Sequence, residues 1–300
     1  MSDKTKIEWT DATWNPVTGC SKVSPGCKHC YAERDWARLV HMPAFAGRAF
    51  TDVACHPERL DQPLLWKKPR RVFVNSMSDL FHESVPVEFI AQLFDVMARC
   101  PQHTFQILTK RPARMQFLLR SEWDRKPLPN VWLGVSIEDQ ATADERIPLL
   151  LQTPAAVRWV SAEPLLGPVD LYWLWSKQVK RHGLGQPLPV GMYAKLNWVV
   201  VGGESGPRAR PMHPQWARDL RDQCAAAGVP FLFKQWGEWF PSSFGQGGSQ
   251  FGAWRGDVFM PRWGDIYTKD NNMVRAGKRA FGARLLDGVQ HDAYPGSATW

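Results

Sequence analysis

The 300-residue sequence lacks several features that would place a protein in a special class. It contains no run of about 18 apolar residues, so we expect no helix that spans a membrane. Its first residues, 1–6, include no apolar signal region, and we therefore expect a cytoplasmic protein whose thiols stay reduced. It also lacks an internal repeat of fixed period and any long low-complexity tract. These absences argue against membrane, secreted and repeat-array proteins.

Basic and aromatic residues are abundant. The net charge is +8, which favours a polyanionic partner such as DNA or RNA. Sixteen tryptophans belong either to a large aromatic core or to platforms on which bases stack, and the core is the better interpretation for most of them. The hydrophobic fraction of 44% is ample for a buried core.

Short apolar runs alternate with helical patterns along the chain. Six runs rich in β-branched and aromatic residues predict strands at 71–75, 104–109, 131–136, 157–161, 198–202 and 230–234, and a weaker seventh covers 12–18. Runs of this kind are typical of strands buried on both faces in a parallel sheet. The helical patterns include one that opens near Pro86, one that follows a predicted capping box at 142–145, and one from Pro214 to Gly228. The alternation predicts an α/β protein, either an open doubly wound sheet or a barrel.

Polar clusters follow nearly every predicted strand. Functional groups at the carboxyl ends of many successive parallel strands are typical of the mouth of a TIM-like barrel. We therefore predict a TIM-like, partial or complete barrel domain over residues 1–240. Residues 241–300 are rich in Gly, Ser and aromatic residues at first and are predicted to form a C-terminal cap or extension of the same domain.

Three cysteines lie within eleven residues, at Cys20, Cys27 and Cys30, in a loop rich in Gly, Ser and Pro. Thiols at this spacing, C-x6-C-x2-C, predict a metal site. A closed structural zinc site takes four protein ligands. A four-iron cluster held by three cysteines instead leaves one iron open to a small molecule. Cys55, Cys100 and Cys224 are scattered and are predicted to be plain free thiols.

The cysteine loop, with Tyr31 directly after the last cysteine, resembles that of radical S-adenosylmethionine (SAM) enzymes. The wider pattern at 14–20 and 26–32 is more similar to the phage-associated three-Cys-motif proteins, which are considered radical-SAM-like. The spacing departs from the commonest superfamily form, which has three residues between the first two cysteines where this chain has six. The resemblance implies a partial (β/α)6 barrel, a [4Fe–4S] cluster on the three cysteines, SAM and an electron donor.

The resemblance also implies positions for SAM. The second-strand position of the superfamily's amino-group motif is occupied here by Ser76 and Ser78, and the ribose position by Ser136 and Glu138. Gly202-Gly203-Glu204 follows a much later strand than the superfamily's Gly-Gly-Glu motif. We therefore expect it to contact SAM adenosine or the substrate, with a plain turn and a capping carboxylate as the alternative.

Lys110 and Glu163 end two further strands and are the predicted catalytic residues at the barrel mouth, unless they form a simple ion pair. Trp236 is expected either to stack on a substrate or to plug the barrel.

Two alternatives concern the metal and the partner. A structural zinc site would use the three cysteines with His29 or a distant residue such as His82, in a non-catalytic nucleic-acid-binding protein. Basic residues mixed with aromatics in the insert 171–196, together with the run 67–71, suit a phosphate backbone with bases to stack, or form a solvated surface. The expected substrate is DNA, RNA or a nucleotide.

Overall fold

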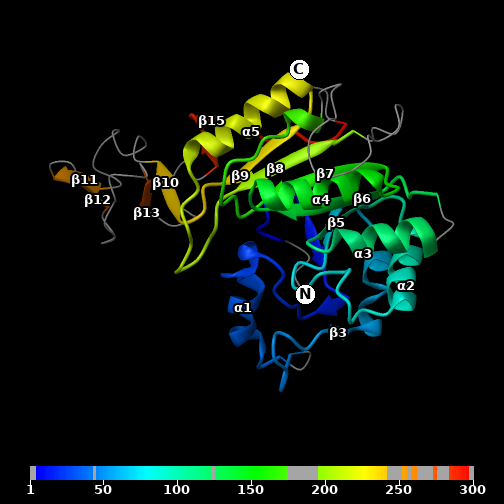
Figure 1. The fold of residues 1–300 in the computed structure, drawn as a ribbon. Helices are drawn as coiled ribbons and strands as arrows, with labels where there is room; N and C mark the ends of the chain where they lie inside the picture. Colours follow the sequence, from blue (N-terminus) through cyan, green and yellow to red (C-terminus); the bar gives the residue numbers. More distant parts are fainter. Residues whose placement is uncertain are drawn as a thin grey trace. The chain divides into compact units, whose positions relative to one another are not determined.

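The computed structural model describes residues 5–42, 45–122, 126–174, 195–241, 252–255, 258–261, 273–275 and 284–296 (Figure 1). The chain divides into two compact units. The first comprises residues 1–136, 144–161 and 188–197, and the second comprises 137–143, 162–187 and 198–300. Segments from the middle of the chain contribute to both units.

The first unit contains most of the parallel strands. They are β1 (Ala12–Trp14), β4 (Arg71–Val74), β5 (Thr104–Thr109), β6 (Val131–Ile137) and β7 (Val157–Ala162). β1 pairs with β4, β4 with β5 and β5 with β6, all in parallel. Their side chains are almost all buried, which explains why their sequences do not alternate between apolar and polar residues.

Helices and short pairs complete the first unit. The helices are α1 (Tyr31–Leu39), α2 (Val87–Ala98) and α3 (Pro112–Phe117), with a π turn at Leu118–Glu122. The 3-10 turns are η1 (Pro25–Cys27), η2 (Pro57–Arg59) and η3 (Gln62–Leu65). β2 (Val17–Thr18) and β3 (Ala54–Cys55) form a small antiparallel pair.

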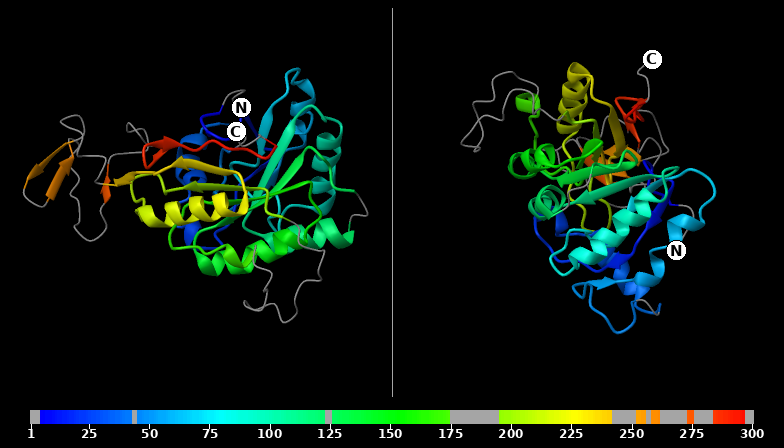
Figure 2. Two further views of the ribbon diagram at one scale, coloured as in Figure 1. Left: turned by 90° about the horizontal axis from the view of Figure 1, so that it is seen from above. Right: turned by 90° about the vertical axis from the view of Figure 1, so that its right-hand side faces the viewer.

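The second unit is built on β8 (Trp198–Gly202) and β9 (Phe231–Gln235), which pair in parallel. Helix α5 (Pro214–Ala227) lies along these strands (Figure 2) and ends at Gly228, whose left-handed backbone closes it as predicted. The remaining elements are η5 (Tyr172–Leu174), β10 (Trp239–Pro241) with β13 (Met273–Arg275), β11 (Gly252–Arg255) with β12 (Val258–Pro261), and β14 (Leu285–Leu286) with β15 (Val289–Gln290). Asp287 and Gly288, which connect β14 and β15, both have positive φ.

The strand order of the main sheet is β1-β4-β5-β6-β7-β8-β9, so seven strands follow one another as they do in the sequence. The six predicted strands are present, each within one residue of its expected ends, and the weaker seventh run supplies β1 and β2. The α/β prediction is confirmed, with a parallel sheet of seven strands.

Helix α4 (Gln140–Gln152) begins earlier than predicted. The backbone N–H of Thr142 donates to Asp139 Oδ1 at 2.9 Å, and Thr142 Oγ1 accepts from the N–H of Asp139 at 3.1 Å. The reciprocal capping box is therefore formed by residues 139 and 142, and the predicted box at 142–145 is wrong. The Thr142 hydroxyl points toward the start of the helix, and the Asp139 carboxylate accepts the hydrogen bond of the Thr142 backbone amide.

Seven tryptophans of the described residues are buried, which confirms the core interpretation for them. Trp9 packs edge-on against Trp159, with ring centroids 5.1 Å apart. A Cβ at Gly134 would lie only 2.5 Å from the Trp159 ring, so this strand position needs glycine. Among the residues that the structure describes, no helix is long and apolar enough to cross a membrane.

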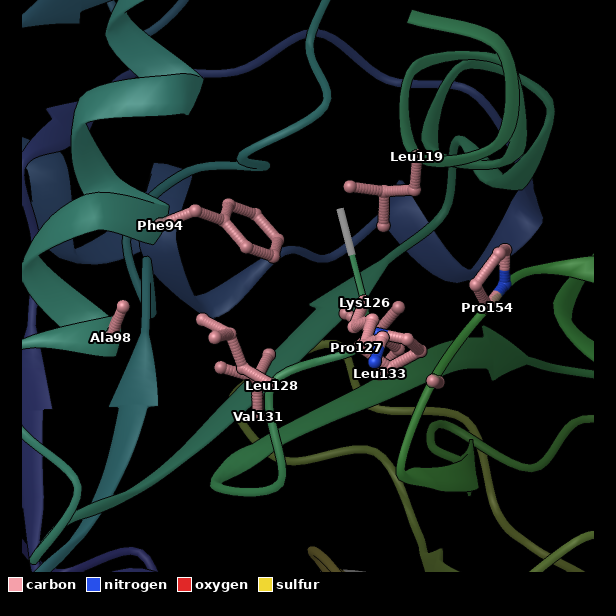
Figure 3. A pocket seen from close by; sticks show the side chains of 10 residues that line it. Phe94, Ala98, Leu119, Lys126, Pro127, Leu128, Val131, Leu133 and Pro154 are labelled. Carbon is pink, nitrogen blue, oxygen red and sulfur yellow. The ribbon is translucent and has the colours of Figure 1, made fainter. Parts of the chain in front are cut away.

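A cavity of about 60 Å³ in the first unit is lined mainly by apolar side chains, including Phe94, Leu119 and Leu133 (Figure 3). Sites for small molecules usually measure ~300–1,000 Å³. This cavity is therefore a packing defect between α2, the π turn and β6 rather than a substrate site.

Candidate functional site

The cysteine loop is fixed at its start by backbone contacts. Gly19 has φ +86°, and a Cβ there would lie 2.6 Å from the carbonyl oxygen of Asp52. Gly19 also forms a parallel bridge with Ser78 in the loop after β4, and the N–H of Cys20 donates to the carbonyl of Phe50 at 2.8 Å. Only glycine fits this conformation and this close approach. The first cysteine is thus held between two distant segments of the first unit.

The three thiols are free and partly exposed. Cys20 and Cys30 pack against the cluster formed by Ala32, Trp36, Phe45 and Phe50, whereas Cys27 Sγ lies 3.8 Å from Ser24 Oγ. Cys27 ends the 3-10 turn, and Cys30 is the residue that precedes α1. The donor set therefore fits an iron–sulfur cluster or zinc in chemistry. In the described parts of the chain, however, no three His, Cys, Asp or Glu side chains converge closely enough to hold a metal ion.

Arg111 is the charged residue that contacts the first cysteine. Its Nη1 donates to Cys20 Sγ at 3.7 Å and to Asp79 Oδ2 at 3.2 Å. Its Nη2 donates to both the carbonyl and the hydroxyl of Ser21, at 3.2 and 2.8 Å, and its Nε donates to Glu83. Only 5% of this side chain is exposed. Lys110 was the catalytic residue predicted from the sequence at the end of β5, whereas its neighbour Arg111 is the residue that reaches the cysteine loop.

Asp79 joins the ends of β4 and β5. Its carboxylate accepts from Thr109 Oγ1 at 2.7 Å, from the Lys110 N–H at 3.0 Å and from Arg111. The pKa of the Cys20 thiol is raised to about 11, mainly by burial and then by the nearby Asp79 carboxylate, while the Arg111 guanidinium lowers it. Metal binding at this thiol would replace its proton, since thiolate is the ligand form.

His82 lies beside the loop as well. Its Nδ1 accepts from the N–H of Ser84 at 3.1 Å, so the proton resides on Nε2, which lies 2.9 Å from Ser21 Oγ. Burial and the Arg111 charge lower the pKa of His82 and favour this neutral form. His82, the distant histidine considered for zinc, thus contacts Ser21, which is the neighbour of Cys20 in the sequence.

The predicted SAM residues Ser76 and Ser78 lie close to the cysteine loop. Ser76 Oγ donates to Asn15 Oδ1 at 3.1 Å, and Ser78 Oγ donates to the Val17 carbonyl at 2.9 Å. The Tyr31 hydroxyl, next to the last cysteine, donates to the Ser76 carbonyl at 2.5 Å. The protons of the two serine hydroxyls are therefore engaged by Asn15 and Val17, so an ammonium donor could bind these residues only through their oxygen lone pairs.

In the second unit, Glu163 and Lys234 form an ion pair. Both carboxylate oxygens of Glu163 accept from Lys234 Nζ, at 2.7 and 2.8 Å. A Cβ at Gly202 would lie 3.1 Å from the Glu163 carboxyl carbon. The predicted catalytic glutamate is thus bound by a different lysine from the one considered as its partner.

Gly203 and Glu204 make close contacts with other residues of the protein. A Cβ at Gly203 would lie 1.9 Å from the Trp236 carbonyl oxygen. The Glu204 carboxylate accepts from the backbone N–H of Arg210 at 2.8 Å and from its guanidinium at 2.6 Å. This is the arrangement that the turn-and-capping alternative expected.

The remaining predicted residues at strand ends are buried. Ser136, in the first unit, is 3% exposed, and its carbonyl accepts from Arg146. Glu138, in the second unit, is fully buried, and its carbonyl accepts from the N–H of Leu166. The indole of Trp236 is 1% exposed and donates to the carbonyl of Leu285, so this residue fills the interior.

Residues 4–295 match the family described as Protein of unknown function (DUF5131). The chain belongs to this family. No curated protein and no solved structure matches this chain. The match of the DUF5131 family spans the cysteine loop, Arg111 and both units. Because the family's description assigns no activity, the roles of these residues are argued from their chemistry and contacts alone.

Most of the basic insert 171–196 lies outside the residues that the structure describes, since residues 175–194 are not among them. The side chains on which the nucleic-acid prediction depended are also outside the description. They are Trp175, Lys177, Lys180 and Arg181, together with the side chain of Trp173. In the run 67–71, Lys67 and Lys68 are exposed, Arg70 lies 5.0 Å from the Trp66 ring, and Arg71 pairs with Asp11.

Proposed function

We propose that the protein is a radical SAM enzyme in which Cys20, Cys27 and Cys30 hold a [4Fe–4S] cluster. The observation that carries the proposal is the loop itself, in which three free thiols follow β1, the first strand of the parallel sheet. The chemistry supplied by the bound group is one-electron reduction of SAM, which gives methionine and a 5′-deoxyadenosyl radical that abstracts hydrogen from a substrate.

The chain's own residues would bind and orient the reactants. Ser76 and Ser78 offer hydroxyl oxygens beside the loop for the amino group of SAM. Closure of the three thiols on a cluster requires their side chains to turn toward a common point, which their partial exposure allows. The expected contacts of Ser136 and Glu138 with the SAM ribose remain predictions within this proposal. So do a contact of residues 202–204 with SAM adenosine or the substrate and the catalytic roles of Lys110 and Glu163.

The finer architecture and the substrate are part of the same proposal. We propose that the seven-stranded parallel sheet is the partial (β/α)6 barrel of that superfamily, with one additional strand. A nucleic acid or nucleotide is the proposed substrate, since the net charge of +8 favours a polyanion. A separate electron donor would supply the reducing electron.

The test is anaerobic reconstitution with ferrous iron and sulfide. The wild-type protein should turn brown, carry four irons per cluster and, once reduced, convert SAM to 5′-deoxyadenosine. Replacement of any one of Cys20, Cys27 or Cys30 by alanine should abolish the colour. Cys55→Ser is the matched control, because Cys55 is also a partly buried free thiol of the first unit but lies on β3. A loaded cluster that neither binds nor cleaves SAM would contradict the proposal.

The second candidate is a zinc-containing nucleic-acid-binding protein without catalysis. The observation that favours it is the position of His82, whose Nε2 lies 2.9 Å from the hydroxyl of Ser21, the neighbour of Cys20 in the sequence. To become the fourth ligand, Nε2 would have to give up its proton to Nδ1, which would then lose the hydrogen bond from the Ser84 N–H. Metal analysis separates the two proposals. A colourless protein with one zinc per chain, whose zinc is lost in His82→Ala, would support this candidate over the first.

A further inference from the structure

Arg111 connects two segments of the first unit that are 91 residues apart in the sequence. It is the second residue after β5, yet two of its three guanidinium nitrogens donate to residues 20 and 21 of the cysteine loop. The third, Nε, donates to both Glu83 oxygens, at 3.2 and 3.0 Å. Every guanidinium nitrogen is therefore engaged, which leaves Arg111 as a clamp rather than a binding site for a free anion.

The burial of this clamp shows what compensates its charge. The side chain of Asp79 is 8% exposed, whereas Glu83 is 67% exposed and therefore well screened by solvent. The buried charge of Arg111 is thus balanced mainly by Asp79, with the Cys20 sulfur as its next neighbour. A buried cation is costly unless it is paired and hydrogen-bonded. The geometry needs a planar fork, because two donors must reach residues 20 and 21 while a third reaches Glu83.

We propose that Arg111 is a positioning residue of the metal site, holding Cys20 and Ser21 in place and placing positive charge against the first thiolate. Its effect on a bound metal rests on the proposed function, whereas its effect on the loop does not. A cationic N–H donor beside a metal-bound thiolate withdraws negative charge from the sulfur. It therefore favours the more negative, reduced state of the bound group and raises its reduction potential.

Two variants and a control separate geometry from charge. Arg111→Lys keeps the charge but loses the fork, whereas Asp79→Asn/Arg111→Gln removes both charges together and so avoids a buried unpaired carboxylate. Arg114→Gln is the matched control, because Arg114 lies three residues away and donates only to backbone carbonyls at 82 and 85. Folding of each variant is checked by its circular dichroism and its cooperative unfolding.

The first measurement is hydrogen exchange of the loop amides at 19–22 in metal-free protein. Both Arg111 variants should exchange at least about tenfold faster there than the wild type, since hydrogen bonds from a charged donor are lost, and Arg114→Gln should not. Unchanged exchange in both folded variants would overturn the positioning role, whatever metal the protein binds.

The second measurement uses the protein reconstituted with ferrous iron and sulfide. The double variant should hold less iron per chain than the wild type. Because it also removes the Asp79 charge, which opposes that of Arg111 at Cys20, its midpoint potential is compared with that of a further reference variant, Asp79→Asn alone, and should be the lower of the two. Equal potentials in Asp79→Asn and the double variant would overturn the electrostatic part. If the wild type binds no iron, the proposed function fails by itself, and the exchange measurement still decides whether Arg111 positions the loop.

Discussion

Single residues show where reasoning from the sequence reached the site and where it stopped. Gly202 and Gly203 were expected to contact SAM adenosine or the substrate, with a plain turn as the alternative, and the group that lies against Gly203 is the chain's own carbonyl at Trp236. Arg111 could not be selected over Lys110, because both follow the same strand, and only contacts with residues distant in the sequence show which side chain reaches the cysteine loop. The cysteines themselves were identifiable because their spacing is local.

The close approach at Gly203 leads to a stability prediction. Gly203→Ala would bring its methyl group against the Trp236 backbone, which cannot move without shifting the end of β9, so we expect a loss of about 3 kcal/mol or more in unfolding free energy. Gly228→Ala is the control. Its φ is +64°, but nothing lies within 4 Å, so only backbone strain of about 1–2 kcal/mol is expected. Urea unfolding followed by circular dichroism compares the two. A smaller loss at 203 than at 228 would contradict the observed approach.

At the scale of elements, strands were easier to predict than helix starts. A run of buried apolar residues marks a strand by its composition alone, and β5 and β8 begin and end where expected. Helix α4 was misplaced because its sequence contains two overlapping capping patterns, Asp139-x-x-Thr142 and Thr142-x-x-Glu145. Which of the two patterns caps the helix depends on the residue at which β6 ends, and no local sequence pattern determines that residue.

The observed cap of α4 leads to a second stability prediction. Asp139→Ala removes the acceptor of the Thr142 amide, and Thr142→Val removes the acceptor of the Asp139 amide, so each should lower the unfolding free energy by about 1 kcal/mol. Glu145→Ala is the control and should change it by less than about 0.5 kcal/mol, because its side chain is 66% exposed. Urea unfolding curves decide the matter. A larger effect at Glu145 than at Asp139 would restore the cap expected from the sequence.

For the whole molecule, the sequence predicted the class and the order of its strands but not its division into units. Alternating strand and helix patterns with strands buried on both faces determine a parallel α/β sheet, and seven strands lie in chain order. The two compact units interleave segments from the middle of the chain, so their boundaries depend on contacts between distant residues that no local pattern records.

The net charge of +8 is the property of the whole molecule that bears on its partner, and it leads to the last prediction. If a nucleic acid is the substrate, affinity for single- or double-stranded oligonucleotides should fall steeply as salt rises, because each neutralised phosphate releases counterions. Lys67→Glu/Lys68→Glu should reduce the slope of log K against log salt by about 2, provided that each exposed lysine meets a phosphate.

Lys6→Glu/Lys126→Glu changes the net charge by the same amount at exposed positions outside the basic run, and its slope should stay close to that of the wild type. Equal slopes in the two variants would mean that attraction comes from the overall charge and not from a surface at 67–71. If the wild type does not bind oligonucleotides at low salt, the search for a substrate would move to small molecules or peptides. Electrostatic attraction is strongest at low salt, so a protein of charge +8 that fails to bind a polyanion there has no electrostatic site for one.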